Sequence, residues 1–372
     1  MGVCMRMIGR WLMLLVFAGA ALAVAGGLVV YSVPQVQDAI FDRIATSALG
    51  GTRDDLLKDD ALRAIVCGSS SPMPDPARAK ACIAVIAGGK IYFVDTGPQS
   101  MGKVALMRLP LARIGGIFYT HFHSDHIADL GEFNMNSWVL GRTAPLDVYG
   151  PTGVERVVAG FQEAYALDQT YRTAHHGTAV ADPALWKMVA HPIVLAGEAT
   201  KAHDRTAIVF DDGQLKVTAI EVEHEPINPA FGYRFEYKGR SLVISGDTQK
   251  HGPLAIAAKG ADVLFHEAQA QHMVKRLKSI AESKGNTRLA KLMFDIQDYH
   301  TSPVEAAEAA NAAGVKLLVL YHYTPPVLNI VAQRIFTRGV DEARDGDWMM
   351  SRDGTLIELP LGTGVVKKSD MN

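Results

Sequence analysis

The chain has 372 residues, of which 48 % are hydrophobic and 20 % are charged. A chain of this length can bury a large core, and length alone allows either one large domain or two. The formal net charge of −2 gives no electrostatic footprint for wrapping a polyanion, which normally shows as a basic patch or a high isoelectric point. Composition therefore argues against a general polyanion-binding protein and leaves only a local basic patch open.

The first predicted element is an apolar helix at the N-terminus. Residues 11–33 contain no charged side chain, and they follow Arg6 and Arg10. About 20 apolar residues cross the hydrocarbon core of a membrane, whereas a cleavable signal has a shorter apolar core. We therefore predict that residues 1–35 are an uncleaved transmembrane anchor, with a removed signal segment as the alternative. In both cases the positive flank keeps the N-terminus in the cytoplasm and exports the rest to the periplasm or the cell exterior.

The exported part is predicted to hold one large domain. Residues 36–60 are mixed and polar and are expected to form a linker, residues 61–366 the domain, and residues 367–372 a frayed polar tail. Cys67 and Cys82 fall in the exported part, where an oxidising compartment permits a disulfide. The sequence is equally compatible with two buried free thiols.

Short apolar strands alternate with helices along the domain. The strands are predicted at residues 82–86, 91–94, 114–119, 241–244, 263–265 and 316–320. A polar residue lies at the C-terminal end of several of these strands. A helix is predicted from Ser302, an N-cap residue with Glu305 three positions later, to Gly314. The alternation predicts an α/β fold with helices around sheet layers.

Two stretches have the character of insertions, residues 134–212 and residues 269–298. The second is predicted to be helical, with apolar residues on one face and Lys275, Arg276 and Lys278 among the others. An amphipathic surface helix explains this pattern. A cap whose basic residues face an anionic substrate explains it as well.

A dense group of potential metal ligands follows the strand at 114–119. His121, His123, Asp125 and His126 lie within six positions. Residues two apart in an extended segment point the same way, so His121 and His123 can hold one ion together. Asp125 and His126 then turn toward the next helix and can reach a neighbouring ion. No packing rule requires so many ligands in one short run, so the run indicates a metal site.

Three further ligands are predicted at later positions, and the full set suits two ions. A single catalytic ion usually has three protein ligands and an open position, whereas two-ion sites hold ions about 3.5–4 Å apart. The ligands predicted for the first ion are His121, His123 and His224. Those predicted for the second ion are Asp125, His126 and His322, with Asp247 bridging both. Imidazole-rich ligation favours zinc, with manganese or iron as alternatives.

These motifs resemble those of a known superfamily. The run from His121 to His126 resembles the HxHxDH signature of the metallo-β-lactamase superfamily, and Asp95-Thr96-Gly97 is similar to an earlier motif of that superfamily. Ser245-Gly246-Asp247-Thr248 and His322 are similar to its later motifs. The resemblance extends from residue 67 to residue 322. It implies an αββα sandwich with a dimetal site at one edge, between two sheets.

Two more motifs resemble those of the ribonuclease Z branch. They are Phe265-His266-Glu267-Ala268 and His300-Thr301-Ser302. In that branch the glutamate orients the histidine, which stabilises or protonates the leaving oxygen. The resemblance therefore implies these catalytic roles for Glu267 and His300, with Asp125 assisting the attacking water. A purely structural hydrogen-bonded pair is the alternative for Glu267 and His300.

The chain departs from that branch at one place. Ribonuclease Z enzymes carry a Gly/Pro-rich arm for tRNA between the positions matching His224 and Asp247, but only 22 residues lie between these two here. With export and a near-neutral charge, this favours the arylsulfatase-like and phosphodiesterase-like relatives that lack the arm. A small anionic ester is therefore the predicted substrate, and nucleic acid is not an expected partner. The membrane is a predicted partner through the N-terminal helix, and a homodimer is compatible with the sequence.

The predicted function is a dinuclear zinc hydrolase that cleaves phosphate or sulfate esters with a metal-bridging hydroxide. A water between two zinc ions loses a proton near pH 7, which supplies this nucleophile at neutral pH. The alternatives are a ribonuclease Z-type endoribonuclease and a lactonase or thioesterase-like hydrolase. A metal-binding scaffold without turnover is disfavoured because Glu267 and His300 accompany the complete ligand set.

Overall fold

The computed structural model describes residues 2–48, 50–197 and 203–371, and its contacts divide the chain into two units, residues 1–52 and residues 53–372. The first unit consists of helices α1 (Gly2–Ser32) and α2 (Pro34–Ala48). Among the described residues, only α1 is long and apolar enough to cross a membrane, over Leu15–Ser32. The predicted apolar helix is therefore present. Its role as an anchor or a signal stays a prediction.

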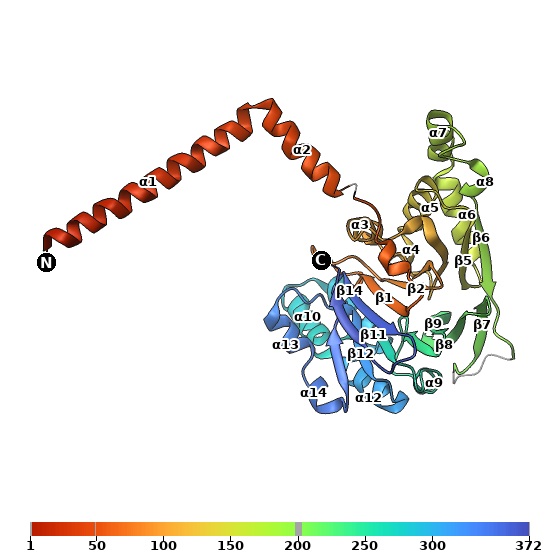
Figure 1. Cartoon of the computed structure of the whole chain (residues 1–372). Helices are drawn as coiled ribbons and strands as arrows, with labels where there is room; N and C mark the ends of the chain where they lie inside the picture. The colour runs from red at the N-terminus through yellow and green to blue at the C-terminus, as the bar shows by residue number, and fades with distance from the viewer. Residues whose placement is uncertain (1, 49, 198–202, 372) are drawn as a thin grey trace. The chain divides into compact units, whose positions relative to one another are not determined.

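The second unit is built on two β-sheets (Figure 1). Within the described residues the first sheet has eight strands, in the order β15 (Lys367–Asp370), β14 (Thr355–Pro360), β1 (Ala61–Gly68), β2 (Cys82–Ala87), β3 (Lys90–Val94), β4 (Ile114–Phe118), β5 (Leu146–Pro151) and β6 (Met188–Ile193). The second has seven described strands, in the order β13 (Asp347–Met350), β12 (Leu317–Thr324), β11 (Val263–Gln269), β10 (Arg240–Ile244), β9 (Ile227–Tyr237), β8 (Leu215–His224) and β7 (Thr206–Asp211). Both sheets mix parallel and antiparallel pairs.

The main core lies between the two sheets. Phe118 of β4 meets Tyr233 and Phe235 of β9 in the opposite sheet, with ring centroids 5.5 and 5.6 Å apart. All three side chains are fully buried. Aromatic side chains bury a large apolar area each, so this contact contributes strongly to holding the sheets together.

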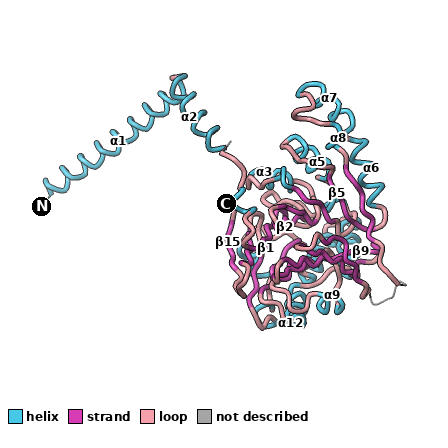
Figure 2. The backbone as a smooth tube through the Cα atoms, turned by 45° about the vertical axis from the view of Figure 1, so that its right-hand side comes forward, coloured by secondary structure: helices cyan, strands magenta, loops and turns pink. Residues whose placement is uncertain are grey.

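Helices cover the outer face of each sheet (Figure 2). Buried residues of α3 (Ser100–Leu106), α5 (Leu130–Val139) and α6 (Val154–Ala164) pack on the first sheet, and those of α9 (Gly252–Ala257) and α12 (Pro303–Ala313) pack on the second. The other helical elements are η1 (Asp54–Leu57), η2 (Leu111–Arg113), α4 (Ser124–Ile127), α7 (Ala166–His176), α8 (Pro183–Trp186), α10 (Gln271–Ser283), α11 (Thr287–Asp295), η3 (Ile296–Asp298), α13 (Ile330–Phe336) and α14 (Val340–Ala343). The layers follow the order helix, sheet, sheet, helix, which confirms the predicted α/β fold.

The predicted boundaries are confirmed at some places and wrong at others. Helix α12 has the predicted capping box at Ser302 and Glu305, and Gly314 ends it in the left-handed conformation with φ of 64°. In contrast, residues 367–370 do not form the expected frayed tail but pair with β14 as strand β15. This strand carries four exposed polar side chains, so its sequence gives no apolar alternation by which a strand could have been predicted.

Cys67 and Cys82 form a disulfide between β1 and β2. Cys67 and Cys82 are 15 residues apart in sequence, and both are almost fully buried. Their neighbouring strands bring the Cα atoms to 5.0 Å, within the range that a disulfide spans. The structure thereby settles the pairing that the sequence leaves open.

Removing this disulfide is expected to lower the free energy of unfolding by about 3 kcal/mol, because cross-linking a loop of about 15 residues restricts the unfolded chain. The Cys67→Ala/Cys82→Ala variant and the wild type can be compared by denaturant unfolding, followed by tryptophan fluorescence. Cys4→Ala is the matched control, since Cys4 is not in the bond. Equal unfolding midpoints for wild type and double variant would contradict the prediction.

Candidate metal centre

Seven potential ligands from distant parts of the sequence meet at one edge of the sandwich. His121 and His123 lie in the loop after β4, and Asp125 and His126 lie in the short helix α4 that follows. His224 is the last residue of β8, Asp247 follows β10, and His322 lies in β12. The structure therefore brings together all seven residues that the sequence predicts as ligands.

Their side-chain atoms form three overlapping groups in which all ligand atoms lie within 4.8 Å of one another. The groups are His121, His123 and His224; His121, His126 and Asp247; and Asp125, His126 and His322. The first and third groups have the composition predicted for the two separate ions. The second joins them, because it shares one residue with each and adds Asp247.

Asp247 lies where a bridging carboxylate would be placed. Its Oδ2 is 3.4 Å from Nε2 of His126 and 4.0 Å from Nε2 of both His121 and His224. Its Oδ1 is 3.4 Å from Nδ1 of His322. One carboxylate thus faces ligands from both predicted sets.

The chemistry of this cluster fits divalent cations. Within the described residues, buried ligand atoms without a hydrogen-bond partner include Nε2 of His126, Nε2 of His224, Oδ1 of Asp247 and Nδ1 of His322. A buried polar atom left unsatisfied costs about 1–3 kcal/mol, so several in one cluster call for a common partner. A mixture of imidazole nitrogens and carboxylates binds zinc, and a cation would satisfy these atoms together.

The pKa shifts favour the metal-binding forms of two imidazoles and one carboxylate, whereas Asp247 and Asp95 outweigh burial and raise the pKa of His126. Burial lowers the pKa of His224 to about 4 and that of His121 well below its usual value. Burial alone raises the pKa of the Asp247 carboxyl, but the charges of His322 and His126 outweigh it and hold that pKa well below the usual range. Neutral imidazole and ionised carboxylate are the forms that coordinate metal ions.

Residues outside the ligand set orient the imidazole rings. Nδ1 of His126 donates a hydrogen bond to Oδ2 of Asp95 at 2.8 Å, and the backbone N and Oγ1 of Thr120 donate to the same carboxylate, both at 2.9 Å. Nδ1 of His224 donates to the backbone oxygen of Tyr299 at 3.0 Å. These bonds leave Nε2 of each ring for an ion, as in other metal sites. The sequence did not assign these orienting roles, although Asp95 could have been suspected because it ends an apolar strand.

Irregular backbone aims His322 at the cluster. The sequence predicts that strands β11 and β12 end near Glu267 and His322. This is wrong, because the two strands continue to Gln269 and Thr324. Their register pairs Glu267 with Tyr321 and Ala268 with Tyr323, so His322 is an extra residue in β12. It has a φ of 49°, which is unusual for a residue with a side chain. Such a bulge re-aims a side chain without ending the strand.

Glu267 and His300 form the predicted pair beside the ligands. Oε1 of Glu267 accepts a hydrogen bond from Nδ1 of His300 at 3.0 Å and from the backbone N of Thr301 at 3.0 Å. The His300 ring centroid lies 5.4 Å from that of His224 and 6.0 Å from that of His322. Burial lowers the pKa of His300, but the charge and hydrogen bond of Glu267 outweigh burial and raise it. The arrangement can supply a proton next to the metal ligands.

Comparisons with known proteins agree with this geometry. A family model described as a beta-lactamase superfamily domain matches residues 91–323. Ribonuclease Z of Mycobacterium bovis is 34 % identical over 270 residues, which are 72 % of this chain and 87 % of the relative. Ribonuclease Z of Mycobacterium marinum is 34 % identical over 265 residues, which are 70 % and 86 % of the two chains.

Solved structures share the fold at lower identity. The short form of human tRNase Z has a TM-score of 0.57 and 20 % identity, with 80 % of this chain and 100 % of that chain covered. A diphosphatase from the PhnP family has a TM-score of 0.52 and 18 % identity, with 81 % and 99 % covered. At these identities the likeness concerns the fold alone.

The relatives contradict the predicted partners. A small anionic ester was expected as the substrate, and nucleic acid was not expected, yet the two relatives that are 34 % identical over 72 % and 70 % of the chain are ribonuclease Z proteins. The prediction was wrong because it relied on net charge, which averages over the whole surface and hides local basic faces. It also relied on the missing arm and on the expected export of the domain.

Proposed function

Since the chain belongs to the beta-lactamase superfamily and is a hydrolase acting on ester bonds, we propose that it is a ribonuclease Z-type enzyme that cleaves phosphodiester bonds in RNA. The observation that carries this proposal is the Glu267–His300 pair beside the ligand cluster. The alignment with ribonuclease Z relatives over 87 % of their length supports it. The sulfate-ester interpretation has no comparable support.

We propose two zinc ions as the cofactor, held by the seven ligands as the sequence predicts. Zinc at this site would neutralise charge on the phosphoryl oxygens and make a hydroxide nucleophile available near pH 7. The three overlapping ligand groups and the unsatisfied atoms of four ligands support this proposal.

The protein residues then have distinct roles in the reaction. The carboxylate of Asp125, whose Oδ2 lies 3.2 Å from Nε2 of His322, assists the attacking water by accepting its hydrogen bond. His300 donates a proton to the leaving ribose oxygen. Because Glu267 occupies Nδ1 of His300, Nε2 is the ring nitrogen left to deliver that proton. Acid assistance of this kind contributes typically 10²–10⁴-fold.

We also propose that residues 1–35 anchor the chain in a membrane and that the hydrolase unit is exported. The apolar helix over Leu15–Ser32 supports this location. The disulfide between Cys67 and Cys82 supports it independently, because disulfides persist mainly in oxidising compartments. The substrate would then be RNA outside the cytoplasm.

A side-by-side assay tests the proposed function. The purified full chain is expected to cleave precursor tRNA or unstructured RNA oligonucleotides, to lose this activity in chelator, and to regain it with zinc. Bis(4-nitrophenyl) phosphate, nitrophenyl sulfate and a lactone serve as comparison substrates under the same conditions. Hydrolysis of the sulfate or the lactone without any cleavage of RNA would refute the proposal.

A further inference from the structure

A helical hairpin separates the two proposed catalytic residues Glu267 and His300. Residues 270–299 form α10, α11 and η3, and we call this segment the α10–α11 hairpin. Its helices pack on each other, and α10 buries Val274 and Ala281. Along the chain, β11 with Glu267 is followed by the hairpin, and the hairpin is followed directly by His300.

The base of the hairpin is bound to the backbone on both sides of His300. Nε2 of Gln269 donates to the backbone oxygen of Ile296 at 2.7 Å, and the backbone N of Gln269 donates to that of Thr301 at 2.8 Å. Nε2 of Gln271 donates to the backbone oxygen of His300 at 3.3 Å. These bonds fix the start of α10 next to the proposed proton donor.

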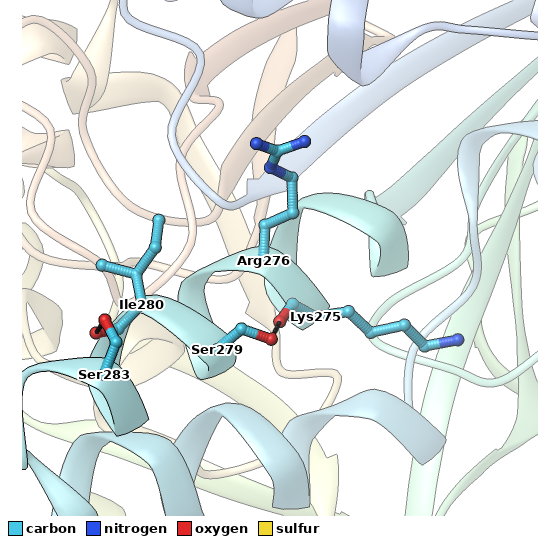
Figure 3. Close-up of a pocket in the computed structure, with 5 residues that line it drawn as sticks. All are labelled: Lys275, Arg276, Ser279, Ile280 and Ser283. Carbon is cyan, nitrogen blue, oxygen red and sulfur yellow. Dashed lines mark hydrogen bonds between the residues drawn. The ribbon is translucent and has the colours of Figure 1, made fainter.

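The exposed face of α10 is basic and slightly hollowed. A shallow cavity of about 370 Å³ is lined by Lys275, Arg276, Ser279, Ile280 and Ser283 (Figure 3). Figure 3 shows the guanidinium of Arg276 extended from one side of the helix and the ammonium of Lys275 extended along another. Four of the five lining side chains carry a polar group, and two of these are cations.

The two cations of this face are not neutralised by the protein. In the described part of the chain no ion pair joins Lys275 or Arg276 to an acidic residue, whereas Lys278 of the same helix pairs with Glu282 at 2.6 Å. The hairpin contains six basic and three acidic residues, although the whole chain has a net charge of −2. A local positive face beside a phosphodiester-cleaving site is complementary to a phosphate backbone.

We infer that the exposed face of α10 binds the phosphate backbone of the RNA substrate, with Lys275 and Arg276 as the principal contacts. This inference rests on the proposed ribonuclease function. In it, α10 takes the RNA-binding role that the Gly/Pro-rich arm has in ribonuclease Z enzymes. Backbone contacts of this kind position a nucleic acid and carry little sequence information. The face therefore holds RNA of varied sequence with one phosphate group near His300.

The test removes the two charges and measures RNA binding against salt. Binding of a fluorescent RNA to the full chain is measured in chelator, which prevents cleavage. In the Lys275→Gln/Arg276→Gln variant, the slope of log affinity against log salt is expected to become about 1.4–1.8 less negative, since each lost phosphate contact contributes about 0.7–0.9. With zinc, the KM for RNA should rise while kcat changes little.

Controls separate this inference from the function on which it rests. Lys187→Gln/Lys259→Gln removes the same charge from exposed positions outside the hairpin and should leave the slope unchanged. Hydrolysis of bis(4-nitrophenyl) phosphate should be equal in all three proteins, which shows that the folded site is intact. A wild type that cleaves RNA and a hairpin variant with unchanged slope and KM would overturn the inference and leave the function standing.

Two further outcomes would also overturn it. If the wild type hydrolyses bis(4-nitrophenyl) phosphate but neither binds nor cleaves RNA, the proposed function and the inference fail together. Leu292 and Phe294 on α11 are exposed apolar side chains, so a membrane surface is the alternative binding partner of the hairpin. If the hairpin variant loses binding to phosphatidylglycerol vesicles while its affinity for RNA is unchanged, α10 faces lipid instead.

Discussion

Replacing Asp247 by asparagine is expected to reduce hydrolysis by at least about 10³-fold and to lower the zinc content of the chain. The carboxylate faces ligands of both predicted ions, at 4.0 Å from His121 of the first set and 3.4 Å from His322 of the second. An amide has nearly the same shape but no negative charge, so it cannot balance two cations. Metal ions stabilise transition-state charge by several kcal/mol, and each 1.4 kcal/mol corresponds to a tenfold rate.

Metal analysis of the purified variant and kcat/KM on RNA and on bis(4-nitrophenyl) phosphate measure this effect. Asp262→Asn is the matched control for loss of a buried carboxylate, because Asp262 pairs with Arg240 at 2.9 Å and lies outside the ligand groups. The control should keep its zinc per folded chain. A fully active Asp247→Asn variant with two ions would contradict the bridging role.

The sequence predicts much of this site because its ligands are placed by local rules. The run from His121 to His126 is dense enough to be recognised alone, and Asp247 lies three positions after the end of an apolar strand. The placement of His322 could not be derived in the same way. Its bulge and its φ of 49° depend on pairing with β11, which is a tertiary property.

The orienting contacts are hidden from the sequence for the same reason. Asp95 reaches His126 across 31 positions, and the backbone of Tyr299 reaches His224 across 75. Neither separation in sequence corresponds to the repeat of a helix or a strand, since both contacts form only when the sheets pack together. The pairing of Cys67 with Cys82 likewise depends on the alignment of β1 with β2.

The substrate was predicted less well than the site because charge acts locally. A net charge of −2 describes the whole chain, whereas Lys275 and Arg276 both line a shallow cavity on α10, the helix whose Gln271 is bonded to the backbone of His300. Only the folded hairpin shows that these two cations lack acidic partners within the described residues, while Lys278 has one. A composition argument therefore excludes a uniformly basic surface but not a basic docking face.

The His300→Ala variant is expected to lose about 10²–10⁴-fold in kcat on RNA, the usual contribution of a positioned general acid. The loss should be much smaller on bis(4-nitrophenyl) phosphate, because nitrophenolate departs without a proton whereas a ribose oxygen does not. Single-turnover rates on both substrates, measured in the full chain with zinc, give the two ratios. His175→Ala is the matched control, since His175 is exposed on α7 and lies outside both the ligand groups and the α10–α11 hairpin.

The difference between the two substrates decides between catalysis and structure. Glu267 also accepts a hydrogen bond from the backbone of Thr301, so loss of the pair could loosen the site and slow every substrate alike. A proton donor instead matters in proportion to the basicity of the leaving group. Equal losses on both esters would therefore assign Glu267 and His300 a structural role. A loss confined to RNA, reproduced more weakly by Glu267→Gln, would establish that His300 protonates the leaving oxygen and that Glu267 positions it.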